Sequence, residues 1–118
     1  MSHNSWPRWR MNTPGSDGVG RVQLRDGRLH IPGEVYERVL LNCPSLALLV
    51  RDGRWQLLPL FGGAGGLLIK IRNARGDRVV EAQEFFRSQG FEQGHEPVEF
   101  DLNPQADGGG FQLLMRSR

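Results

Sequence analysis

The stretch Arg28-Leu-His-Ile-Pro-Gly-Glu-Val-Tyr-Glu-Arg-Val-Leu-Leu41 decides the fold, because a short strand in it passes directly into a short amphipathic helix. Apolar and polar residues alternate at its start, which is typical of a half-buried strand. We predict a helix from Glu34 to Leu41, ended by Asn42 and Pro44. The residues expected on its buried stripe are Val35, Val39 and Leu40.

A two-residue turn lies on each side of this stretch. Asp26-Gly27 follows the expected strand Arg21-Val-Gln-Leu24, and Asp52-Gly53 separates the strands Ala47-Leu-Leu-Val-Arg51 and Arg54-Trp-Gln-Leu-Leu58. Asp-Gly favours a type I′ hairpin turn, because glycine readily adopts the positive φ that such a turn needs. The first half of the chain therefore reads as a ββαββ unit.

The second half repeats this order more loosely. A shift of 50 positions pairs Arg28 with Arg78 and Val35 with Phe85. We predict a second helix from Glu81 to Gln89, and the residues expected to point inward from it are Ala82, Phe85 and Phe86. The expected fold class is mainly β, a β-barrel with two short helices built from a duplicated ββαββ unit. The alternative is two unrelated α+β hairpins.

The chain has 118 residues, enough for one hydrophobic core and too few for two independent ones. We expect a single barrel domain over residues 20–118, made of repeats at 20–60 and 67–116 joined by a glycine-rich linker at 61–66. Residues 1–19 lack sustained periodicity and are predicted to form a flexible N-terminal arm. Its candidate interaction residues are Trp6, Arg8, Trp9 and Arg10, which would dock on the barrel, on a neighbouring subunit or on nucleic acid.

The net charge is +2, carried by fourteen arginines and one lysine against thirteen acidic residues. This balance permits binding to phosphate or to acidic partners without requiring it, and arginine suits bidentate contacts. A GC-rich coding sequence would give the same arginine bias. The longest near-apolar run, residues 57–69, is interrupted by proline and glycines, so we expect no membrane span. The start of the chain lacks the apolar stretch of a signal peptide, and we expect a cytoplasmic protein.

Catalytic and metal-binding patterns are weak. His3, His30 and His95 are far apart, and the single cysteine, Cys43, favours a packing role in a reducing compartment. We therefore expect no metal, no cofactor and no enzymatic activity. His30 alternates with apolar neighbours and should face away from the core. Glu92, Glu96 and Glu99 with His95 form an acidic cluster whose expected state is solvated rather than catalytic.

The first half resembles the AbrB and MazE family of DNA-binding domains. The matching residues are Gly27-Arg28, Ile31-Pro32, the apolar helix positions Val35 and Val39, and the final turn Arg51-Asp-Gly-Arg54. The tandem arrangement resembles the MraZ-like form of that family. The resemblance implies a swapped-hairpin or cradle-loop barrel with a DNA-binding face on the first hairpin. Two departures are Gly33, where the family usually has a basic residue, and Val80-Glu81, which replaces Ile-Pro in the second half.

Three functions fit the sequence. The first is a non-enzymatic DNA-binding transcriptional regulator or antitoxin-like protein, with contacts from Arg21, Arg25, Arg28, Lys70, Arg72, Arg75 and Arg78. The second is a protein-interaction or accessory module that uses the arm and an apolar patch near Trp55, Leu57 and Phe61. The third is a small enzyme or ligand-binding barrel. A continuous basic face would favour DNA, and a face interrupted by acidic residues would favour a protein partner. Both a monomer and a homo-oligomer are compatible with the sequence.

Overall fold

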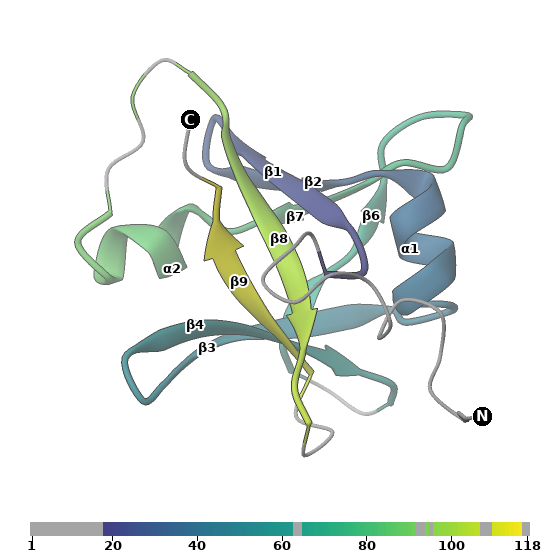
Figure 1. The fold of residues 1–118 in the computed structure, drawn as a ribbon. Helices are drawn as coiled ribbons and strands as arrows, with labels where there is room; N and C mark the ends of the chain where they lie inside the picture. Colours follow the sequence, from purple (N-terminus) through teal and green to yellow (C-terminus); the bar gives the residue numbers. More distant parts are fainter. Residues whose placement is uncertain (1–17, 63–64, 92–93, 95, 107–109, 117–118) are drawn as a thin grey trace.

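The chain folds as a nearly closed β-barrel with a short helix on each of two opposite sides (Figure 1). The structure, a computed structural model, describes residues 18–62, 65–91, 94, 96–106 and 110–116. Its strands all pair antiparallel within one sheet. The predicted fold class, a mainly β barrel with two short helices, is confirmed.

The elements follow the predicted ββαββ order twice. The first half contains β1 (Arg21–Arg25), β2 (Arg28–Ile31), α1 (Gly33–Val39), β3 (Ser45–Arg51) and β4 (Arg54–Leu60). The second half contains β5 (Leu67–Leu68), β6 (Lys70–Ile71), β7 (Arg78–Glu81), α2 (Gln83–Ser88), β8 (Val98–Pro104) and β9 (Phe111–Met115). Within the described residues, neither helix is long and apolar enough to cross a membrane.

One interrupted strand closes the barrel. The strand order is β5-β3-β4-β9-β8-β1-β2-β7-β6, so β5 and β6 lie at the two ends of the sheet. In sequence they are separated only by Ile69, whose N–H donates to the carbonyl of Pro44 at 3.0 Å. Residues 67–71 therefore act as one strand that pairs with β3 at its start and with β7 at its end.

The two halves exchange their first strands. β1 of the first half pairs with β8 of the second, where Val22 lies opposite Phe100. In return, β5 of the second half pairs with β3 of the first, where Leu67 lies opposite Leu46. Each half therefore completes the sheet of the other, as a swapped-hairpin barrel requires.

The strand registers relate the two halves by an approximate two-fold axis. β2 and β7 pair Arg28 with Glu81 and Ile31 with Arg78. Adding 50 to the first-half residue of each pair gives the second-half residue of the other pair, since 28 becomes 78 and 31 becomes 81. On the far side of the barrel, β4 and β9 pair residues 56 with 112 and 57 with 111, and a shift of 55 has the same effect. The symmetry of both pairings fits a duplicated unit.

The two Asp-Gly turns adopt the predicted conformation. Asp26 and Gly27 have φ angles of 54° and 77°, and Asp52 and Gly53 have 55° and 74°. Positive φ at both central residues defines a type I′ turn, whose twist matches that of the flanking strands. The turns therefore set the register of the β1–β2 and β3–β4 hairpins.

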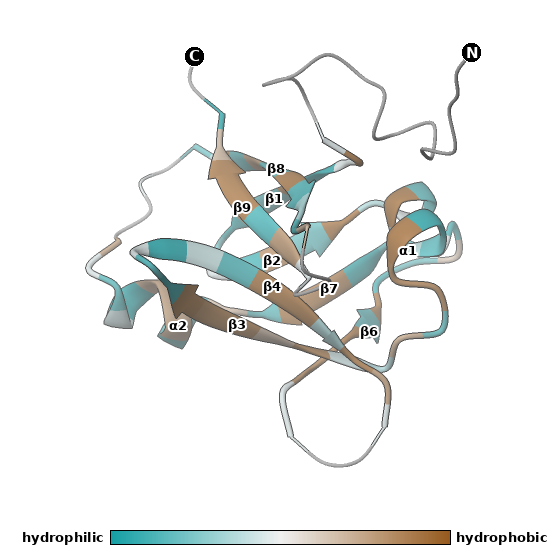
Figure 2. Ribbon diagram, turned by 60° about the horizontal axis from the view of Figure 1, so that its bottom comes forward, coloured by the Kyte–Doolittle hydropathy of each residue, from teal (hydrophilic) through white to brown (hydrophobic). Residues whose placement is uncertain are grey.

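Both halves contribute to one hydrophobic core. The largest fully buried side chains are Phe100, Leu24, Leu29, Ile31, Leu40, Leu46, Leu57, Leu102, Val22, Val80 and Cys43. Figure 2 shows that hydrophobic residues make up most of β3 and much of β9, the strands that contribute Leu46 and Leu113 to this core. The predicted packing role of Cys43 is confirmed, because it is buried and its Sγ lies 2.9 Å from the carbonyl oxygen of Ser45.

Both helices are shorter than predicted. α1 begins at Gly33 and ends at Val39, and α2 begins at Gln83 because Glu81 continues β7 and pairs with Arg28. The N–H of Ala82 then donates to the carbonyl of Gly27 at 3.0 Å, which fixes the start of α2 under the β1–β2 turn.

The inward face of each helix also differs in part from the prediction. Val35, Leu40, Ala82 and Phe86 are buried as predicted, whereas Val39 and Phe85 are only partly buried. Tyr36 is buried instead, and its hydroxyl donates to the carbonyl of Cys43 at 2.8 Å.

An aromatic cluster replaces the predicted apolar surface patch. The ring of Trp55 meets those of Phe86, Phe91 and Phe100 at centroid distances of 5.1, 5.6 and 6.0 Å, in edge-to-face arrangements. Leu57 is fully buried, because alternation along β4 puts it on the same inner face as Trp55. Of the three residues predicted for the patch, Phe61 alone is exposed.

The barrel begins two residues earlier than predicted. Gly18 bridges Leu102, and Val19 is buried with its N–H donating to the Leu102 carbonyl at 3.0 Å. The Val19 carbonyl accepts a hydrogen bond from Arg38 of α1 at 2.6 Å. These contacts attach residues 18 and 19, the end of the predicted arm, to the barrel. The candidate arm residues Trp6, Arg8, Trp9 and Arg10 lie outside the described residues.

Phe86, rather than its neighbour Phe85, is expected to dominate the stability of this end of the barrel. Phe86→Ala should lower the free energy of unfolding by about 3–5 kcal/mol, the usual cost of truncating a fully buried phenylalanine. Phe85→Ala should cost less, because Phe85 is only partly buried. Urea denaturation of both variants measures the difference. Equal losses, or a larger loss for Phe85→Ala, would contradict the described packing of α2.

Candidate nucleic-acid interface

The arginines and the lysine that the sequence predicts to contact DNA are called the candidate cations. Those of the first half lie on the outer surface of the barrel. Burial alternates along β1 and β2, and the residues that point outward from these strands include Arg21, Arg25, Arg28 and His30. None of these four is fully buried. His30 therefore faces away from the core, as predicted.

The pairing of β2 with β7 places the second half on the same surface. Directly opposed residues form a row across five strands, in the order Glu99, Gln23, His30, Val79 and Lys70. A parallel row contains Arg25, Arg28 and Glu81. We call this outer surface of β8, β1, β2, β7 and β6, with the loop 72–77, the hairpin face.

Three of the candidate cations have carboxylate partners. Arg28 Nε lies 2.7 Å from Glu81, a contact that joins the two halves at the surface. Arg75 lies 3.2 Å from Asp77. Arg21 Nε lies 3.7 Å from Asp101, which is also bound by Arg116 at 3.1 Å. These ion pairs reduce the positive potential that Arg21, Arg28 and Arg75 present to a ligand.

Arg78 does not belong to the outer surface. Its guanidinium carbon lies 4.0 Å from the centre of the Tyr36 ring, a cation–π contact with α1. The same guanidinium donates a hydrogen bond to the carbonyl of Gly76. Arg78 pairs with Ile31, a buried residue, so its side chain leaves the sheet toward α1. Its contacts indicate a structural function that links the two halves.

Three candidate cations remain without a partner among the described residues. The side chains of Arg25, Lys70 and Arg72 make neither an ion pair nor a hydrogen bond with any of them. Arg25 comes from the first half, and Lys70 and Arg72 come from the second. The structure therefore brings cations from both halves to the hairpin face that form no ion pair with the described residues.

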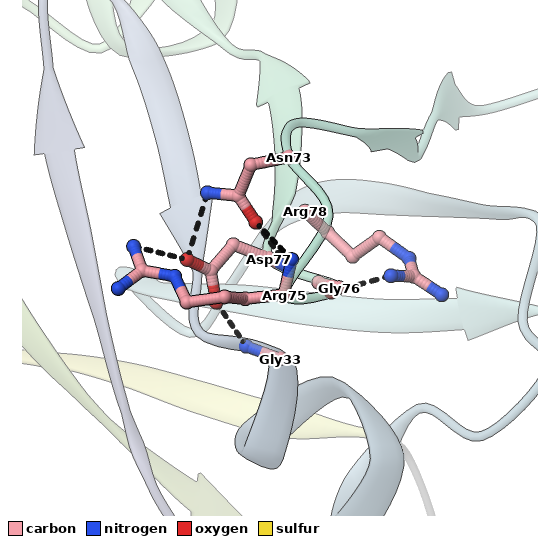
Figure 3. Close-up of polar contacts among 6 residues, drawn as sticks. All are labelled: Gly33, Asn73, Arg75, Gly76, Asp77 and Arg78. Carbon is pink, nitrogen blue, oxygen red and sulfur yellow. Dashed lines mark hydrogen bonds and ion pairs between the residues drawn. The ribbon is translucent and has the colours of Figure 1, made fainter.

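The loop between β6 and β7 is held by a polar network centred on Asp77 (Figure 3). One carboxylate oxygen of Asp77 accepts from the backbone N–H of Gly33 at 2.7 Å, and the other accepts from the Asn73 amide at 3.1 Å. The Asn73 side-chain oxygen in turn accepts from the backbone N–H groups of Arg75 and Asp77 at 3.0 and 3.3 Å. The network ties the loop to the start of α1.

This network explains why a glycine occupies position 33, where the resembled family usually has a basic residue. A Cβ atom at position 33 would lie 3.0 Å from the carbonyl oxygen of Arg75, so a larger residue would push the loop away. The same donors lower the pKa of Asp77, with the Gly33 N–H as the largest cause, followed by Asn73 and then by the charges of Arg75 and Arg72. Asp77 is therefore an anion at neutral pH that pairs with Arg75 and lies within the electrostatic influence of Arg72.

A hollow of about 240 Å³ lies on the hairpin face, between the outer surface of β1 and β2 and the loop that Asp77 holds. We call it the His30 hollow. Its charged and titratable lining residues are Arg21, Arg25, His30, Arg72, Asp77 and Glu99. All three of these arginines were expected from the sequence to contact DNA. Their proximity to His30 could not be predicted, because residues 30 and 72 meet only through the pairing of β2 with β7.

Acidic residues interrupt the hairpin face. Glu99 lies opposite Gln23 in the row described above, and its carboxylate is 3.9 Å from Arg116. Glu81 lies opposite Arg28. Of the predicted acidic cluster, Glu92 and His95 lie outside the described residues, and Glu96 is exposed. The part of the chain that the structure describes contains no group of three potential metal ligands.

The chain matches no protein-family model, no curated protein and no solved structure in the comparisons made with it.

The Asp77 network predicts a specific pH dependence of stability. Asp77→Ala should lower the urea midpoint at pH 7, because it removes the acceptor that joins the loop to α1. A carboxyl whose pKa is lowered by folding stabilises the protein above its unfolded value, here 3.8, and loses this effect as the pH falls through the lower folded value. The difference from the native protein should therefore shrink below pH 4.

Glu37→Ala is a matched control, because Glu37 is an exposed carboxylate on α1 and has no partner among the described residues. This variant should keep the urea midpoint of the native protein both at pH 7 and below pH 4. A difference between Asp77→Ala and the native protein that is constant from pH 7 to pH 2 would contradict the ionised state of Asp77.

Proposed function

We propose that this protein is a non-enzymatic DNA-binding protein, a transcriptional regulator or antitoxin-like protein that contacts duplex phosphates with its hairpin face. The observation that carries the proposal is the convergence of Arg25, Lys70 and Arg72 on one surface, where they form no ion pair with a carboxylate of the described residues. Each would gain an anionic partner from a phosphate. The resemblance of the first half to the AbrB and MazE family supports the same face.

The geometry suits a two-fold ligand. The β1–β2 and β6–β7 hairpins lie next to each other across the β2–β7 pairing, related by the approximate two-fold axis. Duplex DNA has two antiparallel strands, and dimeric DNA-binding proteins commonly match this symmetry with their own. A duplicated chain provides both half-sites in one molecule.

The ion pairs on this face set the expected strength of binding. A phosphate that binds Arg28 competes with Glu81, and one that binds Arg75 competes with Asp77. We therefore assign most of the electrostatic contribution to the three uncompensated cations. Three phosphate contacts correspond to a slope of about −2.7 for log affinity against log salt, since each contact contributes roughly −0.9. Binding is then weak and strongly dependent on salt.

A protein-interaction module is the second candidate, and a different surface favours it. On the outside of β3, β4 and β5, the exposed apolar residues include Leu49 and Leu68, at 40% and 59% exposure, with Phe61 directly after β4 at 68%. Exposed apolar residues that gather on one surface are typical of protein-binding sites. The mixed charges of the hairpin face would also suit a protein partner.

A salt titration with random duplex DNA tests the proposed function. Native protein should bind at about 50 mM salt and lose affinity with a slope of about −2.7. The double change Arg25→Ala and Arg72→Ala should reduce the magnitude of this slope by about 1.8, because it removes two phosphate contacts. Fluorescence anisotropy of a labelled duplex at several salt concentrations measures the slope.

The double change Arg51→Ala and Arg54→Ala is the control, because it removes the same charge from the β3–β4 turn, outside the hairpin face. It should leave the slope unchanged. Absence of binding at about 50 mM salt, or equal effects of the two double changes, would reject DNA binding by the hairpin face and leave the protein-interaction module as the remaining candidate.

A further inference from the structure

The imidazole of His30 lacks polar contacts within the His30 hollow. Its Nδ1 atom is buried and has no hydrogen-bond partner among the described residues. The rest of the ring also makes neither a hydrogen bond nor an ion pair with them. A buried polar atom without a partner is costly, which indicates that a ligand or solvent group satisfies it. Rotation about the Cβ–Cγ bond would let either ring nitrogen meet such a group.

The charges around His30 make the hollow suitable for an anion. Arg25 and Asp26 approach from β1 and its turn, Arg28 is in β2 itself, and Arg72 approaches from the loop. Arg21, Asp77 and Glu99 also line the hollow, and Val79, opposite His30 on β7, is uncharged.

The carboxylates of the hollow already have partners. Asp77 accepts hydrogen bonds from Gly33 and Asn73, and Glu99 lies near Arg116. Asp101, the partner of Arg21, lies outside the lining. The guanidinium groups of Arg25 and Arg72 form neither an ion pair nor a hydrogen bond with the described residues. Two arginines around a polar ring that lacks hydrogen bonds are a suitable donor set for a tetrahedral oxyanion.

We propose that the His30 hollow binds one phosphate group between Arg25, Arg72 and His30, and that protonation of His30 strengthens this binding. The inference rests on the proposed function in so far as a DNA backbone phosphate is one source of the group. A free phosphate is the other source, and the experiment below separates the two.

The expected direction of the pH effect follows from the charges. Burial lowers the pKa of His30, and the nearby charges of Arg25, Arg72 and Arg28 lower it further. The ring is therefore neutral at pH 7. A bound anion offsets those three cations and favours the imidazolium, so it raises the pKa. By reciprocity, a fall in pH that protonates His30 must strengthen anion binding.

Sulfate is the probe of choice, because it has the geometry of phosphate and does not titrate between pH 5 and 8. NMR of the His30 ring in the native protein, with sulfate replacing chloride at constant ionic strength, should show a rise in its pKa. Apparent sulfate affinity should increase as the pH falls from 7 to 5, by at most about tenfold per pH unit for a single linked proton. An unchanged His30 titration would overturn the proposal without the need for any variant.

Variants locate the effect. His30→Gln keeps a hydrogen-bond donor and should retain the fold, as backbone NMR spectra can verify, but it should lose the pH dependence of sulfate binding. Arg72→Ala should weaken sulfate binding at every pH, whereas the control Arg54→Ala should not. Equal pH dependence in the native protein and in His30→Gln would also overturn the proposal.

The same titrations with duplex DNA separate this proposal from the proposed function. Sulfate binding that depends on His30, without DNA binding, would support the hollow as a site for a free phosphate and reject DNA as the ligand. DNA binding that is indifferent to pH and to His30→Gln would support the proposed function and reject the hollow as the site of a DNA phosphate, and the sulfate titration would then decide whether the hollow binds a free one. DNA binding that strengthens at low pH in the native protein but not in His30→Gln would support both.

Discussion

The antiparallel pairing of β2 with β7 is the constraint on which the rest of the structure depends. It joins the two halves along four residue pairs, from Arg28 opposite Glu81 to Ile31 opposite Arg78. Once these strands pair, β1 can reach β8 and residues 67–71 can reach β3, so each half completes the other. A separate unit of about forty residues would bury too little apolar surface to be stable. The exchange solves this problem, because all of the apolar faces enclose one core.

The same pairing creates the candidate site. It places the first hairpin of each half on one surface, and it brings the loop 72–77 beside His30. Asp77 then determines which positive charges are available, because it binds Arg75 and fixes the loop to Gly33, while Arg72 stays without a side-chain partner among the described residues. The potential of this surface therefore depends on where the acidic partners lie and not on the net charge of the chain alone. Glu81 and Glu99 limit its extent, which makes a small number of specific phosphate contacts a better description than a broad basic surface.

Much of the fold could be predicted from the sequence, because its strongest signals are local. Asp-Gly turns, alternating strands and a helix-length apolar stripe report backbone preferences that act within a few residues. The errors arose where a distant contact decided the outcome. Glu81 fits a helix start by its charge, yet pairing with Arg28 extends β7 through it. Trp55 fits a surface patch, yet the aromatic rings of α2 and β8 cover it. The His30 hollow combines residues from both halves, which no local pattern can predict. Its one local signal is the presence of Asn73 and Asp77 just before β7, which is typical of an ordered turn.

The central claim is that the two halves form one barrel by exchanging their first strands across a β2–β7 pairing. Backbone NOEs in solution test it most directly, because they report which strands are neighbours. We expect cross-strand NOEs between His30 and Val79, between Val22 and Phe100, and between Leu46 and Leu67. NOEs that instead pair β1 with β3 and β6 with β8, within each half, would contradict it and would remove the shared surface on which the proposed site lies.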